Sequence, residues 1–274
     1  MRNYRDTKKR KRERTTCPFA HFALLFLFGF FVSAGCERNP IDDLEVDERH
    51  VVMIRFAAKP LSGSLSKSAA TPEEDLIKKI IMFGVNNQGN IIETFELSSD
   101  TSLTIARKIT WLYAIANPTD SIEAATPSNI SDLMDMTCDY SDAPQSPFLM
   151  SGKSEVIGAS VNIELVRAVA KIEIVGNNFQ ADSVFVIDAP AKGYVFSRDP
   201  FSAPVSDRVT YSYSGSSSIY VAENSKQNPL NLFVTGLYEG EFFAYTITPS
   251  INGEGIDIVR NTYYKIDIIP NTAQ

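Results

Sequence analysis

Residues 161–174 read VNIELVRAVAKIEI, the longest clean alternation of apolar and polar residues in the chain, and the phase of the alternation changes halfway. The apolar set consists of Val161, Ile163 and Leu165 in the first half and of Ala168, Ala170, Ile172 and Ile174 in the second. In a β-strand, a slip of one residue turns every following side chain to the opposite face of the sheet. The stretch therefore predicts one long strand that serves two cores, or a single strand with a bulge near Val166.

These two interpretations give different domain organisations. In the first, the stretch is the last strand of one β-domain, residues 50–166, and continues into the first strand of a second β-domain, residues 167–274. In the second, the chain forms a single sandwich with one bulged strand. Both expect the polar side chains of the second half to point away from the core: Arg167, Lys171 and Glu173.

Short β-signals separated by turn residues run through the rest of the chain. The first half has apolar alternation over residues 50–56, 80–85, 91–97 and 109–115. The second half has seven such segments, residues 184–187, 194–196, 209–213, 219–222, 230–237, 242–248 and 262–268. A spacing of roughly ten residues is typical of Greek-key sandwiches. The predicted fold class is therefore all-β, with two tandem Greek-key β-sandwich domains.

Two short helices are expected between the strands of the first half. Thr71 is followed by Pro72 and Glu74, which is the pattern of an N-cap, a first helical residue and a capping acid. Ser128 precedes apolar residues at helical spacing within residues 130–136, which predicts a serine-capped helix across an open end of the sandwich.

The N-terminus has the composition of a secretory signal peptide, assigned to residues 1–35. Residues 2–14 are strongly basic and residues 19–32 are uncharged and apolar. That apolar run is too short for a spanning helix. The leader ends in small residues followed by Cys36.

A small-small-Cys ending resembles the bacterial lipobox, whose cysteine is acylated, although Ser33 stands where leucine is usual. Cys36 is therefore predicted to carry the lipid, palmitate included, and residues 36–49 to form an acidic tether. The alternative is an ordinary leader cut near Ala34, with Cys36 as an incidental free thiol.

Composition and charge exclude several classes of protein. The hydrophobic content of 44% is that of a folded chain. Without residues 1–35 the chain keeps 18 basic and 31 acidic residues, a net charge of −13, which argues against nucleic-acid binding. Beyond the leader only Cys36 and Cys138 remain, so no disulfide framework is expected.

The sequence offers little catalytic chemistry. The mature part has one histidine, His50, which is expected to be a surface residue at the start of the first strand. Acidic pairs such as Asp42-Asp43 and Asp132/Asp135 are interpreted as solvated loop charge rather than metal ligands. No metal site, cofactor or enzymatic activity is predicted.

One aromatic set leaves two interpretations open. It consists of Tyr211, Tyr213, Tyr220, Phe242, Phe243 and Tyr245. These side chains could form a platform that stacks on sugars, but tyrosine on β-strands is more often found at the rim of a core.

Several segments, taken in order, resemble the fimbrillin family, the subunits of Bacteroidetes type V pili. They are the lipobox at Cys36, residues 50–56, LYAIAN at 112–117, FLMSG at 148–152, LVRAVAKI at 165–172, IYVAEN at 219–224 and RNTYYKI at 260–266. The resemblance covers nearly all of the mature chain.

The resemblance implies an outer-membrane lipoprotein with two β-sandwich domains of transthyretin-like topology. In that family a protease cuts after an arginine and removes the first strand, and a strand from a neighbouring subunit fills the groove. Arg49, between the tether and the first strand, is the candidate processing site. The other interpretation of Arg49 is a solvated tether residue.

Both ends of the chain depart from the polymerising pattern. About a dozen residues separate Cys36 from the first strand, and only residues 271–274 follow the last one, whereas a donor strand needs about five or six. The predicted function is therefore a terminal, accessory or anchor subunit of cell-surface fimbriae that contributes to adhesion. Its expected partners are other fimbrial subunits, the outer membrane through its lipid, and host or bacterial surface ligands. The alternative is a stand-alone surface lipoprotein that binds a glycan or a host protein.

Replacing Cys36 by alanine is expected to release the protein from the membrane fraction, because two acyl chains on this cysteine would be its stable attachment. Fractionation of cells labelled with palmitate measures both attachment and acylation. A Cys36→Ala variant that remains membrane-bound and still labels would contradict the lipid assignment.

Overall fold

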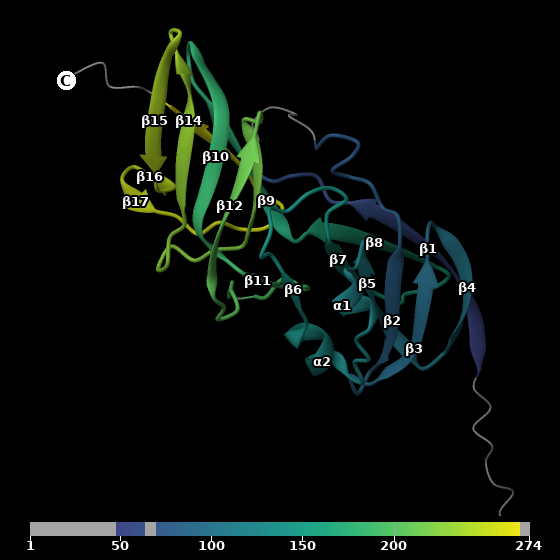
Figure 1. Ribbon diagram of the computed structural model, residues 1–274. Helices are drawn as coiled ribbons and strands as arrows, with labels where there is room; N and C mark the ends of the chain where they lie inside the picture. Colours follow the sequence, from purple (N-terminus) through teal and green to yellow (C-terminus); the bar gives the residue numbers. More distant parts are fainter. Residues whose placement is uncertain (1–47, 64–69, 200, 269–274) are drawn as a thin grey trace, which may run out of the picture. The chain divides into compact units, whose positions relative to one another are not determined.

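The computed structural model describes residues 48–63, 70–199 and 201–268 (Figure 1). These described residues belong to one compact unit. The signal peptide predicted over residues 1–35 and the acylation predicted at Cys36 lie outside the described residues. The described chain is almost entirely β-structure, so the prediction of an all-β fold is confirmed. The tandem Greek-key arrangement and the domain boundaries stay predictions.

The first half of the chain builds a seven-stranded sheet in the order β3-β2-β5-β7-β8-β1-β4. Its strands are β1 (Arg49–Ala58), β2 (Ile80–Asn86), β3 (Ile91–Leu97), β4 (Thr101–Ala106), β5 (Ile109–Ala116), β7 (Met150–Glu155) and β8 (Ser160–Arg167). Val161, Ile163 and Leu165 of β8 pack into one buried apolar cluster with Val52 and Ile54 of β1. The alternation in the first half of the quoted stretch therefore does select core residues.

The second half builds two further sheets, in the orders β12-β10-β14-β15 and β13-β9-β18. Their strands are β9 (Val169–Val175), β10 (Phe179–Pro190), β12 (Arg208–Ser214), β13 (Ser218–Ala222), β14 (Asn231–Tyr238), β15 (Glu241–Ile247) and β18 (Tyr263–Asp267), and a small hairpin of β16 (Ser250–Ile251) and β17 (Glu254–Gly255) follows β15. A second apolar cluster contains Ile172 and Ile174 of β9, Val184 of β10 and Val234 of β14.

A third apolar cluster covers the aromatic face of β5 and draws residues from both halves of the chain. It includes Ile122 of α1 (Asp120–Glu123), Leu133 of α2 (Ile130–Asp135) and Cys138 of β6 (Thr137–Asp139). It also includes Val195 and Phe196, which follow β11 (Lys192–Tyr194), the short strand that pairs with β6. Phe196 packs edge-on against Tyr113, with ring centroids 5.6 Å apart. Residues 194–196 were expected to be a strand of the second domain. That expectation is wrong, because β11 pairs with β6 and the residues after it cover Tyr113.

The phase change in residues 161–174 comes from a break in the strand. β8 ends at Arg167 and β9 begins at Val169, so that Ala168 alone separates them. The ladder between β7 and β8 remains regular up to Arg167, without a bulge at Val166. After the break the chain enters a different sheet, and Ala170, Ile172 and Ile174 of β9 face the second cluster.

The expectation that Arg167 and Lys171 point into solvent is wrong. Their exposed fractions are 2% and 7%, lower than those of many apolar residues in the chain. Both side chains are buried because polar groups from distant loops surround them, as described below for the site. Period-two alternation identifies the face of a strand, but it does not show what covers that face.

Both helix expectations need correction. Thr71 begins only a single turn, in which its carbonyl accepts bonds from the amides of Glu74 and Asp75. The Glu74 carboxylate does not cap this turn, because it pairs with Lys171. The N-cap of α2 is Asn129 rather than Ser128, since the Asn129 side chain accepts a hydrogen bond from the Asp132 amide.

The last strand, β18, is expected to be necessary for the stability of the second half. Ile268 is buried, and Tyr264 and Ile266 pack against the same cluster. A chain that ends at Asn261 should therefore unfold at lower urea concentration, since full burial of one such side chain contributes about 1.5–3 kcal/mol. An Ile266→Ala variant tests the same core without removing the strand. Unfolding midpoints equal to that of the full chain for both variants would remove β18 from the core.

Candidate functional site

Strand β1 lies inside the seven-stranded sheet, between β8 and β4. Its first half, Arg49 to Ile54, pairs antiparallel with β4. Its second half, Met53 to Ala58, pairs parallel with β8. The two ladders overlap only at Met53 and Ile54, so most of β1 is bonded along one edge. The first part of the candidate site is the surface that holds β1. It consists of β4, β8 and the apolar face that buries Val52 and Ile54, and it is called the seat of β1 below.

Arg49 is the first residue of β1, one position before the expected start of the strand. Its backbone pairs with Ala106, and its guanidinium bonds to the Glu93 carboxylate at 2.5 Å and to the Thr104 carbonyl at 2.8 Å. The side chain remains 40% exposed. The structure therefore places the candidate processing residue in the sheet rather than in the tether.

The segment after β1 leads directly to the last strand. Lys59 donates its amide to the Leu165 carbonyl at 2.8 Å, which extends the ladder with β8. Ser62 then pairs with Thr262 in a parallel bridge beside β18. The Asn261 amide side chain donates to the Pro60 carbonyl at 2.9 Å. The exit of the first strand and the entry of the last strand are thus held together.

The second part of the candidate site is a polar junction formed by Glu74, Asp75, Arg167, Lys171, Tyr220 and Asn261. Arg167 lies at its centre. Its guanidinium donates to the Lys59 carbonyl at 2.8 Å, the Glu74 carbonyl at 3.1 Å and the Asn261 side-chain oxygen at 2.6 Å, and it also pairs with the Asp75 carboxylate. Burial lowers the pKa of Arg167 below its ordinary value, whereas the Glu74 carboxylate opposes that shift.

Glu74 connects the same junction to the second half of the chain. Its Oε1 accepts bonds from the Lys171 ammonium at 2.7 Å and from the Tyr220 hydroxyl at 2.5 Å. The Lys171 ammonium also lies 5.9 Å from the centre of the Tyr220 ring. Burial, followed by the bond to Glu74, raises the pKa of the Tyr220 hydroxyl, which therefore stays protonated as a donor.

Sequence reasoning missed this junction. Arg167, Lys171 and Glu74 are charged residues, and an alternation pattern assigns such residues to solvent. Their partners lie far away in the chain, since 94 positions separate Arg167 from Asn261 and 97 separate Glu74 from Lys171. The one available signal was the glutamate of the residue 71–74 pattern, which was attributed to capping.

The structure does not bring catalytic groups together at His50. This residue lies at the start of β1, and its Nδ1 atom is buried without a hydrogen-bond partner in the described part of the chain. Cys138 is buried on β6, where its thiol donates to the Gly193 carbonyl at 3.4 Å and burial raises its pKa. Within residues 48–63, 70–199 and 201–268, no group of three His, Cys, Asp or Glu side chains is arranged to hold a metal ion.

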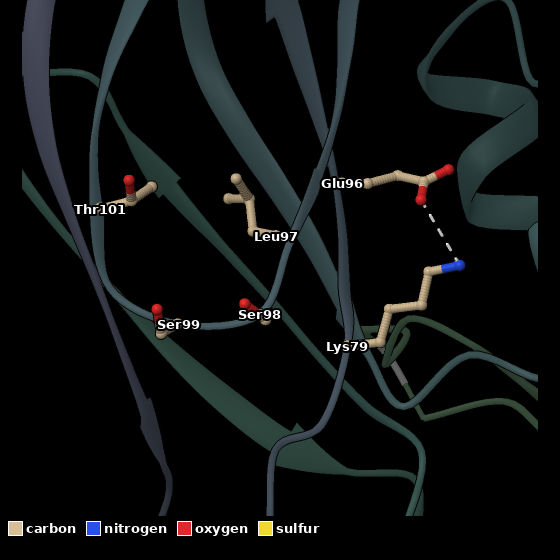
Figure 2. Close-up of a pocket in the computed structure, with 6 residues that line it drawn as sticks. All are labelled: Lys79, Glu96, Leu97, Ser98, Ser99 and Thr101. Carbon is tan, nitrogen blue, oxygen red and sulfur yellow. Dashed lines mark ion pairs between the residues drawn. The ribbon is translucent and has the colours of Figure 1, made fainter.

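A surface hollow of about 370 Å³ lies at the turn between β3 and β4. Figure 2 shows Lys79 facing Glu96, with Ser98, Ser99 and Thr101 along the turn. The Lys79 ammonium bonds to Glu123 at 2.8 Å and lies 3.5 Å from Glu96. The bond to Glu123 raises the pKa of Lys79. Its charge is therefore paired twice, and the hollow offers no free cation to a ligand.

The aromatic set is divided between the core and the surface. Tyr211 is buried in the second cluster, and Tyr213 and Phe243 pack against it. The Tyr213 hydroxyl lies within donating distance of two backbone carbonyl oxygens, 2.8 Å from that of Pro144 and 2.9 Å from that of Tyr220. Phe242 and Tyr245 are exposed to 75% and 48%. The six rings therefore do not form one platform.

Among the described residues, no helix is long and apolar enough to cross a membrane.

Replacing Arg167 by methionine is expected to destabilise the fold by about 3–5 kcal/mol, because it leaves buried acceptors without a donor. Arg107→Met is the matched control, since Arg107 pairs with Glu48 at the surface, where both side chains are more than 60% exposed. The control should cost at most about 1 kcal/mol. Urea unfolding measures both, and equal costs would show that the junction is no more important than a surface ion pair.

Comparison with known proteins supports a relationship at the level of fold. No family model and no curated protein sequence matches the chain. Among solved structures, a candidate cell adhesion protein from Bacteroides eggerthii is 21% identical, with a TM-score of 0.61 over 80% of this chain and 85% of that one. A fimbrial assembly protein from Parabacteroides distasonis is 14% identical, with a TM-score of 0.59 over 83% and 93%.

The tip fimbrial protein Mfa3 from Porphyromonas gingivalis, with a C-terminal truncation, is also similar. It is 16% identical, with a TM-score of 0.56 over 81% of this chain and 97% of that one. The resemblance drawn from the sequence is therefore confirmed in its fold: this chain has the fold of the fimbrial and cell-adhesion proteins of the Bacteroidetes, a fimbrillin-like architecture.

Proposed function

We propose that this protein is a structural subunit of cell-surface fimbriae, in a terminal, accessory or anchor position, and that it contributes to adhesion. The observation that carries the proposal is the shared fold over about four fifths of the chain with a fimbrial assembly protein and a tip fimbrial protein. The proposal assigns no catalytic activity and requires no cofactor. It places the protein at the cell surface, held in the outer membrane by lipid on Cys36.

The proposed partners are other fimbrial subunits, joined by strand addition at the seat of β1. Two features support this seat. Over most of its length β1 is paired along only one edge, with β4 in its first half and with β8 in its second half. An incoming strand that displaces β1 residue by residue would therefore replace few ladder hydrogen bonds at each step. On one side β8 keeps its own ladder with β7, and on the other side β4 is the edge strand, which among the described strands pairs with β1 alone and would pair with the incoming strand in its place. An incoming strand would need apolar side chains in the places of Val52 and Ile54, which are fully buried.

The position of Arg49 gives its proposed processing a defined consequence. A cut after Arg49 leaves residues 50–58 paired in the sheet, because β1 begins at Arg49 itself. Such a cut would separate Cys36 from the folded body. Processing at Arg49 would therefore release the subunit from its lipid, and opening the seat would require a separate step that displaces β1.

Treatment of the folded protein with an arginine-specific protease tests this assignment. The expected product begins at His50, keeps β1 and no longer partitions into membranes, and Arg49→Gln should not yield it. Mass spectrometry and fractionation measure these outcomes. A product that loses β1 would show instead that cleavage opens the seat.

Copurification tests the function itself. Protein isolated from native outer membranes with intact fimbriae is expected to carry other fimbrial subunits. Isolation of the protein without any fimbrial subunit would favour a stand-alone surface lipoprotein that binds a glycan or a host protein.

A further inference from the structure

Strand β15 forms one edge of the sheet β12-β10-β14-β15. In Figure 1 it lies at the outer side of this sheet, next to β14. Its seven residues read EFFAYTI and contain no lysine, arginine or proline. Its ladder with β14 runs without a bulge. Natural edge strands usually contain lysine, proline or a β-bulge, because each of these prevents pairing with another chain. β15 contains none of the three, so its edge is able to accept another strand.

The register identifies the backbone groups on the free edge. Tyr238 pairs with Glu241 across a two-residue turn, in which Glu239 and Gly240 have φ values of 50° and 88°. Hydrogen-bonded pairs alternate with non-bonded ones in an antiparallel ladder. The N–H and C=O groups of Phe242, Ala244 and Thr246 therefore point away from β14. Within the described part of the chain, no backbone hydrogen bond reaches these groups.

The side chains of β15 are less covered than those of its neighbour. Phe242 is 75% exposed and Tyr245 is 48% exposed, whereas Leu232 and Val234 of β14 are fully buried. Phe243 is half-buried, and its ring lies 6.0 Å from the ring of Tyr245. β15 therefore offers two things that pair strands. Its unpaired N–H and C=O groups can form a ladder with another strand, and its exposed aromatic side chains can pack against side chains of that strand.

We propose that β15 pairs antiparallel with β15 of a second copy of this chain, about a two-fold axis at Ala244. A second copy is the proposed partner because β15 is complementary to itself in this register. Phe242 then lies opposite Thr246 of the second copy, Phe243 lies opposite Tyr245, and Ala244 faces its own equivalent. The outward N–H and C=O groups on each copy bond to those on the other, as an isologous interface requires.

Charge is compatible with this register. Glu241 is the one charged residue of β15, and it lies opposite Ile247 of the second copy rather than opposite another acid. The pairing places Phe243 and Tyr245 in cross-strand aromatic contact, which adds to the stability of a sheet. Over longer distances the two copies repel, because the part of the chain after the leader carries a net charge of −13. Added salt should therefore strengthen the association.

The test compares self-association of the full chain with that of two lysine variants. Ala244→Lys puts a charge at the proposed axis, on an exposed position of β15. Ser212→Lys makes a matched charge change at an exposed position of β12, the opposite edge of the same sheet. The parent chain and every variant also carry Cys17→Ala and Cys36→Ala, which remove the lipid site and the unpaired thiols of the leader and the tether. Circular dichroism confirms that each variant folds.

Sedimentation at several protein and salt concentrations gives the result. We expect concentration-dependent dimers that strengthen with salt, at least a tenfold weaker dimer for Ala244→Lys, and no change for Ser212→Lys. Ala244→Cys should form a disulfide-linked dimer on mild oxidation, whereas Ser212→Cys should not. The proposal would be overturned if the parent chain sediments as a monomer and the Ala244→Cys variant forms no disulfide-linked dimer. It would also be overturned by a dimer that Ala244→Lys leaves unchanged, since another surface would then hold it.

Discussion

The buried guanidinium of Arg167 is the interaction on which the connection between the two halves depends. Transfer of this charge from water costs several kcal/mol unless acceptors surround it. The fold supplies these acceptors from three places that are distant in sequence: the segment after β1, the turn at residues 71–75 and Asn261 before β18. A second arginine plays a similar part nearby, because Arg260 pairs with Glu223 and donates to the Tyr194 and Val195 carbonyls. These contacts fix several loops relative to the strands.

Most strands could be predicted from the sequence, because period-two alternation is a local property. The quoted stretch gave the right buried residues on both sides of Ala168. It failed at Arg167 and Lys171, since their burial depends on partners more than 90 residues away along the chain. The short strand β11 failed for a related reason. The apolar residues that follow it, Val195 and Phe196, are typical of any strand, and their contact with the aromatic face of β5 determines where they pack.

The candidate site could be predicted only in part. His50 and Arg49 were located correctly at the start of the first strand to within one residue, yet nothing in the sequence showed that Arg49 would pair with Glu93. The staggered ladders of β1 were also beyond prediction, because pairing partners are set by the whole sheet. The free edge of β15 depends on the same information, since a strand becomes an edge only through the absence of a neighbour in the assembled sheet.

The parallel pairing of β1 with β8 has a mechanical consequence. A pull on the chain before Arg49 acts along the axis of β1. Because β1 pairs side by side with β4 and β8, this tension loads many ladder hydrogen bonds together in shear, instead of opening them one after another from an end. The same pull then reaches Lys59, whose carbonyl is held by Arg167. β1 therefore resists extension through both of its ladders and through the contact at Lys59.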